Sequence, residues 1–131
     1  MTNGYALSDL NDIGDIGYLA TPYTLYDAGI EAAAFMAARI AGKLMEAGVD
    51  VYSPIAECHA VAHAANLDPL DSVRWGSHCE RMARRFDYLL IADMRGWRES
   101  RGVAAEAKWF GEAGKPVFLL RLKPLAVEKL R

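Results

Sequence analysis

The chain has 131 residues, of which 53% are hydrophobic and 24% are charged, and its formal net charge is −2. These values are typical of one globular domain with a hydrophobic core. Proteins that bind nucleic-acid polymers or anionic membranes through their overall charge are strongly positive, and this chain is not one of them.

The remaining composition predicts a cytoplasmic protein. The two cysteines, Cys58 and Cys79, are too few for a disulfide framework, so we expect reduced thiols. No apolar run approaches the roughly 18 residues that a membrane helix needs. The first fifteen residues are polar and carry three aspartates, so we expect no secretory signal.

The hydrophobic pattern predicts four strands that alternate with helices. We expect a flexible arm over residues 1–14 and a single domain over residues 15–131. Strands are predicted at residues 16–21, 49–54, 87–93 and 116–120. Helices are predicted at about 27–47, 58–65, 72–85, from Ser100 to Gly114, and at 124–131, although the stretch 55–70 is ambiguous.

Alternating strands and helices predict an α/β fold with a parallel sheet covered on both faces. Right-handed crossovers favour a doubly wound, flavodoxin-like or Rossmann-like sheet of four to five strands in the order 2-1-3-4. Such sheets bind ligands beyond the carboxyl ends of the strands, where the strand order reverses. Here that point is flanked by the loops "ATPYTLYD" and "MRGWRESRG".

Glu106 is the unusual residue of the fourth predicted helix. At about 100° per residue, Val103, Ala107 and Phe110 form one apolar stripe, and Glu106 falls inside the edge of that stripe. An ionised carboxylate on an inward face is costly unless it is paired or used. It is either a partnered helix residue or a functional one.

The start of the same helix is a candidate site for one phosphate or carboxylate. Ser100 is a good N-cap, and Gly102 permits close approach. Free N–H groups and the helix dipole favour an anion there. Three arginines of the loop can pair with it, namely Arg95, Arg98 and Arg101. Trp97 either stacks on a ligand ring or covers the core.

Glu106 lies about 8–9 Å along the helix axis from Ser100. An anion at the helix start and a carboxylate at that distance can span a sugar phosphate, which would put the carboxylate near the anomeric carbon. A carboxylate there can act as the nucleophile in glycosyl transfer.

Three segments together resemble the nucleoside 2-deoxyribosyltransferase-like superfamily, and most closely a branch of small bacterial and phage proteins. They are "GYLATPYT", the strand end "YSP", and "DYLLIAD…GWRESRGVAAEA…GKPVFLL". The resemblance covers about residues 16–121. It implies that Glu106, in "GVAAE", is the nucleophile that attacks the anomeric carbon and that Tyr18 positions this glutamate.

The resemblance also implies a choice of substrate. Members that act on free nucleosides have an aspartate six residues before the nucleophile, whereas nucleoside 5′-monophosphate hydrolases have a serine there. Ser100 agrees with the hydrolases. Ser100, Arg101 and Gly102 are then expected to hold phosphate, and we add Trp97, Thr21 and His59 as substrate-binding residues.

The chain departs from the superfamily at the residue that protonates the leaving base. An aspartate is usual eight residues before the aspartate that opens the third strand, and counting back from Asp87 gives Cys79. A thiol is a poor general acid for a base nitrogen. Either Glu80 or His78 replaces it, or the catalytic apparatus is incomplete; we assign Glu80 as the third catalytic candidate.

A zinc site is the rival interpretation from another class. All three histidines and both cysteines lie between residues 58 and 79, and His59 and His63 are spaced i, i+4, so on a helix they share a face. However, the cysteines lack CxxC spacing, and "HAVAH" lacks the glutamate of a zinc-protease motif.

The sequence thus predicts an enzyme that cleaves the N-glycosidic bond of a (deoxy)nucleoside 5′-monophosphate, without cofactor or metal. The alternatives are a base-exchanging deoxyribosyltransferase, an inactive nucleotide-binding protein and a zinc protein. The resemblance implies a homodimer or larger assembly, and Tyr26, Trp75 and Trp109 are candidate interface residues.

Overall fold

Strands and helices alternate along most of the chain, as the hydrophobic pattern predicts. The computed structural model describes residues 5–131. Its strands are β1 (Ile16–Ala20), β2 (Asp50–Tyr52), β3 (Leu89–Ala92), β4 (Val117–Leu122) and β5 (Leu125–Lys129). Its helices are η1 (Leu7–Asp12), α1 (Ile30–Glu46), α2 (Pro54–Ala65), α3 (Ser72–Ala83), η2 (Trp97–Glu99) and α4 (Arg101–Glu112), where η marks a 3-10 helix. None of these helices is long and apolar enough to span a membrane.

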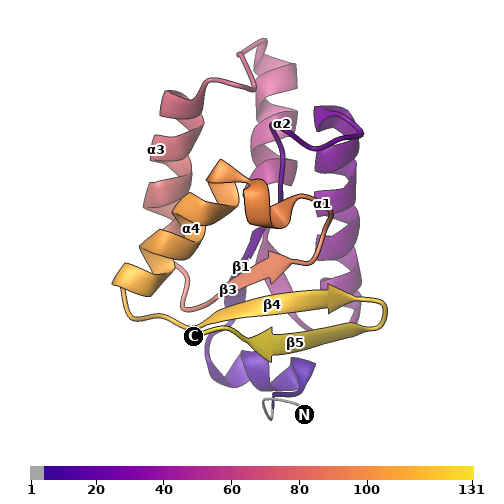
Figure 1. The fold of residues 1–131 in the computed structure, drawn as a ribbon, viewed down its shortest axis with the longest axis vertical. Coiled ribbons are helices and arrows are strands. Elements are labelled where there is room, and N and C mark those ends of the chain that lie inside the picture. The colour runs from indigo at the N-terminus through magenta and orange to yellow at the C-terminus, as the bar shows by residue number, and fades with distance from the viewer. Residues whose placement is uncertain (1–4) are drawn as a thin grey trace.

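The strands form one sheet in the order β2-β1-β3-β4-β5 (Figure 1). The first four are parallel, and β1 lies between β2 and β3. This confirms the predicted α/β class and the predicted order 2-1-3-4. The order reverses between β1 and β3, so the loops that follow these two strands leave the same edge of the sheet side by side.

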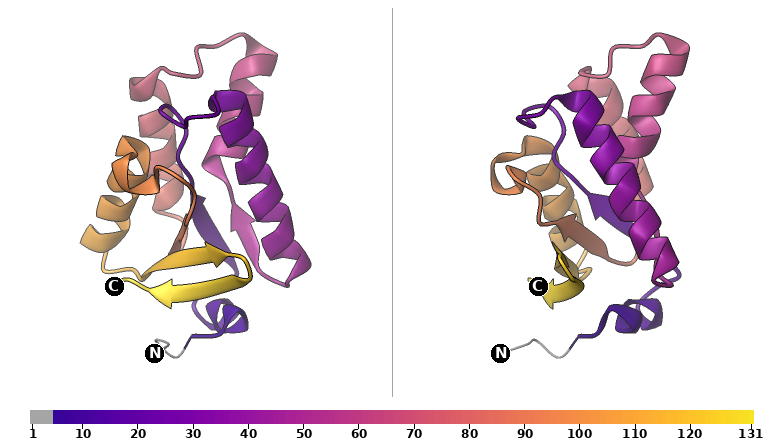
Figure 2. Two further views of the ribbon diagram at one scale, coloured as in Figure 1. Left: turned by 45° about the vertical axis from the view of Figure 1, so that its right-hand side comes forward. Right: turned by 90° about the vertical axis from the view of Figure 1, so that its right-hand side faces the viewer.

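The two faces of the sheet carry separate hydrophobic clusters, because successive side chains of a strand point to opposite faces. Leu19 of β1 belongs to the cluster that α1 covers, together with Ile40 and Leu44. Tyr18 belongs to the cluster that α3 and α4 cover, together with Phe110. Figure 2 shows α1 and α4 on opposite sides of the strands. Helices therefore cover both faces, as expected for a doubly wound sheet.

The expected helix over residues 124–131 is wrong, because this segment forms β5. It pairs antiparallel with β4, with Leu120 opposite Val127 and Leu122 opposite Leu125. Without this strand, the outer edge of β4 would leave a row of backbone groups unpaired. Pairing with that edge outweighs the weak helical preference of a short segment, and this competition is invisible in the local sequence.

The expected flexible arm is folded over its described part. Residues 1–4 of that arm lie outside the described residues. The helix η1 follows them, and Leu10 is fully buried in the cluster beneath α1. Tyr5 packs edge-on against Phe118, with ring centroids 5.1 Å apart. Packing of these two side chains holds the segment against the sheet.

The ambiguous stretch after the second strand is a well-defined helix that begins earlier than predicted. Ser53 caps α2 by accepting a hydrogen bond from the Ala56 N–H at 3.3 Å, and Pro54 occupies the first turn. Proline is favoured there because its missing N–H has no helical partner in any case. The helix ends at Asn66, whose left-handed backbone closes the last turn. It packs against α1, beside the loop that follows β1.

Candidate active site

The predicted ligand-binding edge of the sheet is built by the loops after β1 and β3. The first loop covers residues 21–29 and the second covers residues 93–100. Arg95 of the second loop lies 3.0 Å from the Asp27 carboxylate of the first, so an ion pair joins them. Helix α4 begins directly after the second loop. The two loops that the sequence analysis names therefore lie together at the edge of the sheet where the strand order reverses.

The central feature beneath this edge is a hydrogen bond between Tyr18 and Glu106. The Tyr18 hydroxyl, from β1, donates to Oε2 of Glu106, from α4. Tyr18 is fully buried, and Glu106 is only 7% exposed. The bond joins residues 88 positions apart in the chain. It gives the buried carboxylate the partner that its inward position requires.

The position of Glu106 follows from the pattern of α4. Val103, Glu106 and Phe110 are the buried residues of this helix, spaced three and four apart. Residues at these spacings lie on one face, which here faces β1 and β3. The helical wheel therefore predicts correctly that Glu106 shares the inward face of an otherwise apolar stripe.

Aromatic rings surround the pair and keep water away from it. The Tyr18 ring lies 5.4 Å from Phe110, 5.7 Å from Tyr52 and 5.8 Å from Phe86, measured between centroids. Tyr52 and Phe86 are stacked on each other at 5.4 Å. Electrostatic interactions are stronger in such surroundings than in water.

These surroundings change the acidity of both partners. The pKa of the Glu106 carboxyl is raised to about 8, chiefly by burial, against the lowering effect of the hydrogen bond from Tyr18 and with a smaller increase from nearby Cys79. Burial, and then the Glu106 charge, raise the pKa of the Tyr18 hydroxyl. A carboxyl that titrates near neutral pH can serve as nucleophile, acid or base, and such groups cluster at functional sites.

Cys79, rather than Glu80, borders this pair. The Cys79 thiol is close enough to act on the pKa values of both Tyr18 and Glu106. A hydrogen bond from Cys58 lowers the pKa of Cys79, and the same interaction raises that of Cys58. Glu80 is instead paired with Arg84 at 3.5 Å. Adjacent helix residues point about 100° apart, and this rotation directs Glu80 away from the Tyr18–Glu106 pair.

A polar group that sequence reasoning missed adjoins the aromatic rings. The Tyr52 hydroxyl donates to Glu57 Oε1 at 2.7 Å, and His78 Nε2 lies 3.3 Å from the same oxygen. His78 Nε2 also lies 3.4 Å from the Tyr52 hydroxyl. Of these three residues, His78 alone is named in the sequence analysis. The "YSP" strand end contains Tyr52 and pairs with β1, and it is the sequence feature that points to this group.

The start of α4 is open to solvent. Ser100 caps the helix, and its Oγ accepts a hydrogen bond from the Val103 N–H at 3.2 Å. Arg101 and Gly102 are exposed. A Cβ added at Gly102 would have Ser100 Oγ as its nearest neighbour, at 3.9 Å, so the surface there is uncrowded. This arrangement meets the geometric needs of an anion site at a helix start.

Trp97 covers the core in this structure. It packs against the hydrophobic cluster beneath α4, and its Nε1 donates to Asp93 Oδ1 at 3.1 Å. The Arg98 guanidinium lies over the ring, 4.6 Å from its centroid. Of the two roles considered for Trp97, the structure therefore shows the covering of the core. Arg98 occupies one face of the ring.

A family model matches most of the chain. The family described as Domain of unknown function (DUF1937) has a model that matches residues 15–122. The chain belongs to this family. No curated protein matches the chain. The matched region includes β1 to β4 and every candidate residue named above, whereas η1 and β5 lie outside it.

Two further predicted residues line the inner side of the loop after β1 in the DUF1937 domain. Thr21 is 3% exposed, and its hydroxyl has no hydrogen-bond partner within residues 5–131. His59 Nδ1 lies 2.6 Å from the Tyr23 hydroxyl. Burial, and then the charge of His63, lower the pKa of His59. Both residues stand at the loop where a ligand is expected.

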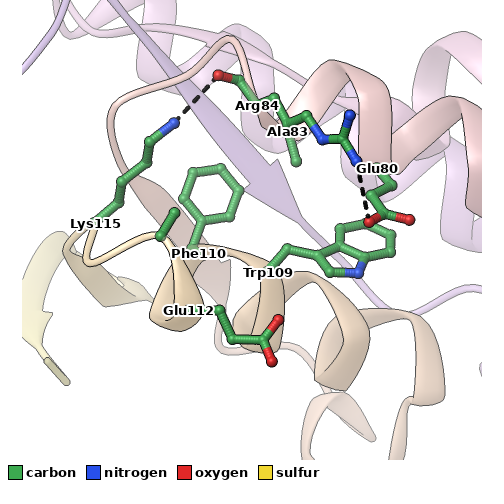
Figure 3. Close-up of a pocket in the computed structure, with 8 residues that line it drawn as sticks. Glu80, Ala83, Arg84, Trp109, Phe110, Glu112 and Lys115 are labelled. Carbon is green, nitrogen blue, oxygen red and sulfur yellow. Dashed lines mark hydrogen bonds and ion pairs between the residues drawn. The ribbon is translucent and has the colours of Figure 1, made fainter.

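Two pockets of the DUF1937 domain flank the buried pair instead of containing it. One, of about 330 Å³, lies between α3 and α4. Figure 3 shows Trp109 of α4 beside Glu80 of α3, whose ion-pair partner Arg84 directly follows that helix. The other, of about 290 Å³, is formed by residues 93–99. The second pocket belongs to the loop that precedes Ser100, and neither pocket is lined by Glu106.

Proposed function

We propose that the chain is an enzyme that hydrolyses the N-glycosidic bond of a (deoxy)nucleoside 5′-monophosphate. The observation that carries the proposal is the buried Tyr18–Glu106 pair at the switch point of the sheet. The pair agrees with the resemblance to the nucleoside 2-deoxyribosyltransferase-like superfamily, in which a glutamate is the nucleophile and a tyrosine positions it.

In the proposed first step, a Glu106 carboxylate oxygen attacks the anomeric carbon. A bond forms between this oxygen and the carbon, and the bond to the base nitrogen breaks with its electron pair going to the base. Water then attacks the same carbon, passes its proton to the group that had protonated the leaving base, and releases Glu106 as a carboxylate. Because two displacements occur, the configuration at the anomeric carbon is retained.

Tyr18 has a positioning role in this scheme. Its hydroxyl fixes Glu106 Oε2 and stabilises the ionised form, which only partly offsets the effect of burial on the pKa. With a pKa of about 8, the fraction of attacking carboxylate increases through neutral pH. We therefore expect the turnover number to be low at acid pH, where Glu106 is protonated.

We assign protonation of the leaving base to His78. Histidine is the commonest general acid in enzymes, and a thiol such as Cys79 is poorly suited to this task. His78 lies beside Glu57 and Tyr52, and Tyr52 contacts the Tyr18 ring. Glu57 can hold the imidazole in orientation. Glu80, in its ion pair with Arg84, takes no part in this scheme.

The phosphate end of the substrate is assigned to the start of α4. Ser100 is six residues before Glu106, which corresponds to about 9 Å along the axis. Ser100, Arg101 and Gly102 present a hydroxyl, a guanidinium and free backbone at an open surface. Arg95 and Arg98 are already engaged with Asp27 and Trp97, so Arg101 is the arginine best placed to pair with phosphate.

The deciding experiment is a chromatographic assay for free base, with nucleoside 5′-monophosphates and the matching nucleosides as substrates. We expect base release from monophosphates, and a decrease by orders of magnitude for Glu106→Gln, which keeps the shape but cannot form the ester. Glu112→Gln, an exposed glutamate on the same helix, is the matched control and should leave the rate unchanged.

Other outcomes separate the alternatives. Transfer of sugar to an added free base, with nucleosides preferred, would identify a deoxyribosyltransferase. Nucleotide binding without any base release would identify an inactive binding protein. Full activity of Glu106→Gln would refute the proposed nucleophile. Trapping a sugar with a slow, electron-poor analogue and locating it on the Glu106 peptide by mass spectrometry would support the intermediate directly.

We also propose that the active form is a homodimer or larger. The α4 start is open, and apolar side chains are exposed on nearby elements, including Leu25 at 80% and Val73 at 82%. Tyr26, Trp75 and Trp109 are partly buried in the single chain and are candidate interface residues. Light scattering at working concentration tests this, and a monomeric mass would contradict it.

A further inference from the structure

A second group of polar side chains lies on the outer side of α1 and α2. His59 and His63 are one turn apart on α2, and their ring centroids are 4.4 Å apart. Glu31, in the first turn of α1, faces them, with Oε2 lying 3.7 Å from His63 Nε2. One ligand atom from each of these three residues lies within 4.8 Å of the others.

The donor set of this group is that of a transition-metal site. Two imidazoles and one carboxylate match the ligands that Zn²⁺ takes in proteins, with a further position left for water. Donors at about 2.0–2.2 Å from a tetrahedral ion lie about 3.3 Å from one another. In the structure the three donor atoms lie within 4.8 Å of one another, and Glu31 Oε2 and His63 Nε2 are 3.7 Å apart. The Glu31 and His63 side chains, exposed by 72% and 56%, can move to bring the donors to the distance that an ion requires.

The surroundings of His59 add a second, independent feature of metal sites. Its Nδ1 lies 2.6 Å from the Tyr23 hydroxyl, which fixes the ring orientation and leaves Nε2 available. Metal-binding histidines almost always use their other ring nitrogen for such a bond. Tyr23 belongs to the loop after β1, so the site would connect that loop with two helices.

A rival group does not share these features. Glu57, Cys58 and His78 also lie within 4.8 Å of one another. However, Glu57 and His78 are already engaged with each other and with Tyr52, and Cys58 is buried. This group also belongs to the site described above.

We propose that Glu31, His59 and His63 bind one divalent cation of the Zn²⁺ class and thereby clamp α1 to α2 beside the loop after β1. The proposal is independent of the proposed hydrolysis, in which no metal takes part. The bound ion would be structural or regulatory, since it ties down a loop that borders the proposed substrate site.

The test is titration calorimetry of Zn²⁺ into full-length protein that has been freed of metal by a chelator and kept reduced. We expect one ion per chain. His59→Ala and His63→Ala should each lower the affinity by roughly tenfold or more, and Tyr23→Phe should lower it about tenfold through loss of the supporting bond. Circular dichroism of each variant shows that the fold is intact.

The controls use the rival group. Cys58→Ser and His78→Ala should leave the affinity unchanged within about twofold, since neither residue contributes a donor to the proposed site. The proposal is overturned if the wild-type chain takes up no zinc, or if stoichiometric binding survives both His59→Ala and His63→Ala. It is equally overturned if Cys58→Ser or His78→Ala removes the binding.

Discussion

The first turn of α4 and the turn around Glu106 belong to one helix, yet they have opposite surroundings. Arg101 and Gly102 are exposed, and their polar groups can exchange partners with water. Glu106 is enclosed by aromatic rings and has a pKa near 8. The open end is suited to bind a charged ligand reversibly, whereas the enclosed end is suited to alter the reactivity of one carboxyl. Four predictions test whether this difference is real.

The largest expected effect is a pH-dependent stability that belongs to Glu106. Its pKa is about 8 in the folded chain and 4.5 in the reference state, so the folded chain keeps a proton that the unfolded chain has lost. This contribution is fully present below pH 4.5 and is lost as the pH increases through 8, with a maximum on the order of 4 to 5 kcal/mol. Urea unfolding between pH 4 and 9 measures it.

Glu106→Gln should remove this dependence, because the amide does not titrate, and the variant should be the more stable protein at pH 9. Glu112→Gln, on the exposed side of the same helix, should retain the wild-type profile. Identical profiles for wild type and Glu106→Gln would mean that the two turns of α4 do not differ electrostatically.

The second prediction concerns the open end of the helix. Ser100→Asp keeps a good N-cap but adds a negative charge where phosphate is expected. Charge-assisted hydrogen bonds are worth about 1.5–3 kcal/mol each, so monophosphate affinity should decrease roughly tenfold to a hundredfold. Affinity for the matching nucleoside should change little. Ser100→Asn, a neutral cap, is the control, and calorimetry measures the affinities of wild type and both variants for the two ligands.

The third prediction compares two buried tyrosines. Tyr18→Phe removes the hydrogen bond to a buried carboxyl and should cost about 1–3 kcal/mol of unfolding free energy. It should also raise the pKa of Glu106, since that bond lowers it. The hydroxyl of Tyr88 is buried without a partner within residues 5–131, so Tyr88→Phe should be neutral or stabilising. Equal losses for both variants would contradict a special role of the Tyr18 bond.

The smallest effect is expected at the surface pair that joins the two loops. The Arg95 and Asp27 side chains are 82% and 54% exposed. Such pairs contribute roughly 0.2–1 kcal/mol, and salt screens them. Arg95→Ala should therefore lower the unfolding free energy by less than about 1 kcal/mol, measured by thermal melting. A larger loss would show that the open end is as tightly integrated as the enclosed one.

Several features of the molecule were accessible from the sequence because they depend on local pattern. The strand order follows from alternating apolar runs and right-handed crossovers. The inward position of Glu106 follows from the helical period, since it lies three residues from Val103 and four from Phe110. The Ser100 cap follows from residue chemistry at a helix start.

The remaining features depend on contacts between elements distant in the chain. The use of residues 125–129 as a strand depends on the free edge of β4. The choice between Cys79 and Glu80 depends on how α3 is rotated against β1, because one residue along a helix changes direction by about 100°. The Tyr52–Glu57–His78 group requires β2, α2 and α3 together. No period in the sequence encodes such rotations, since packing of the whole core sets them.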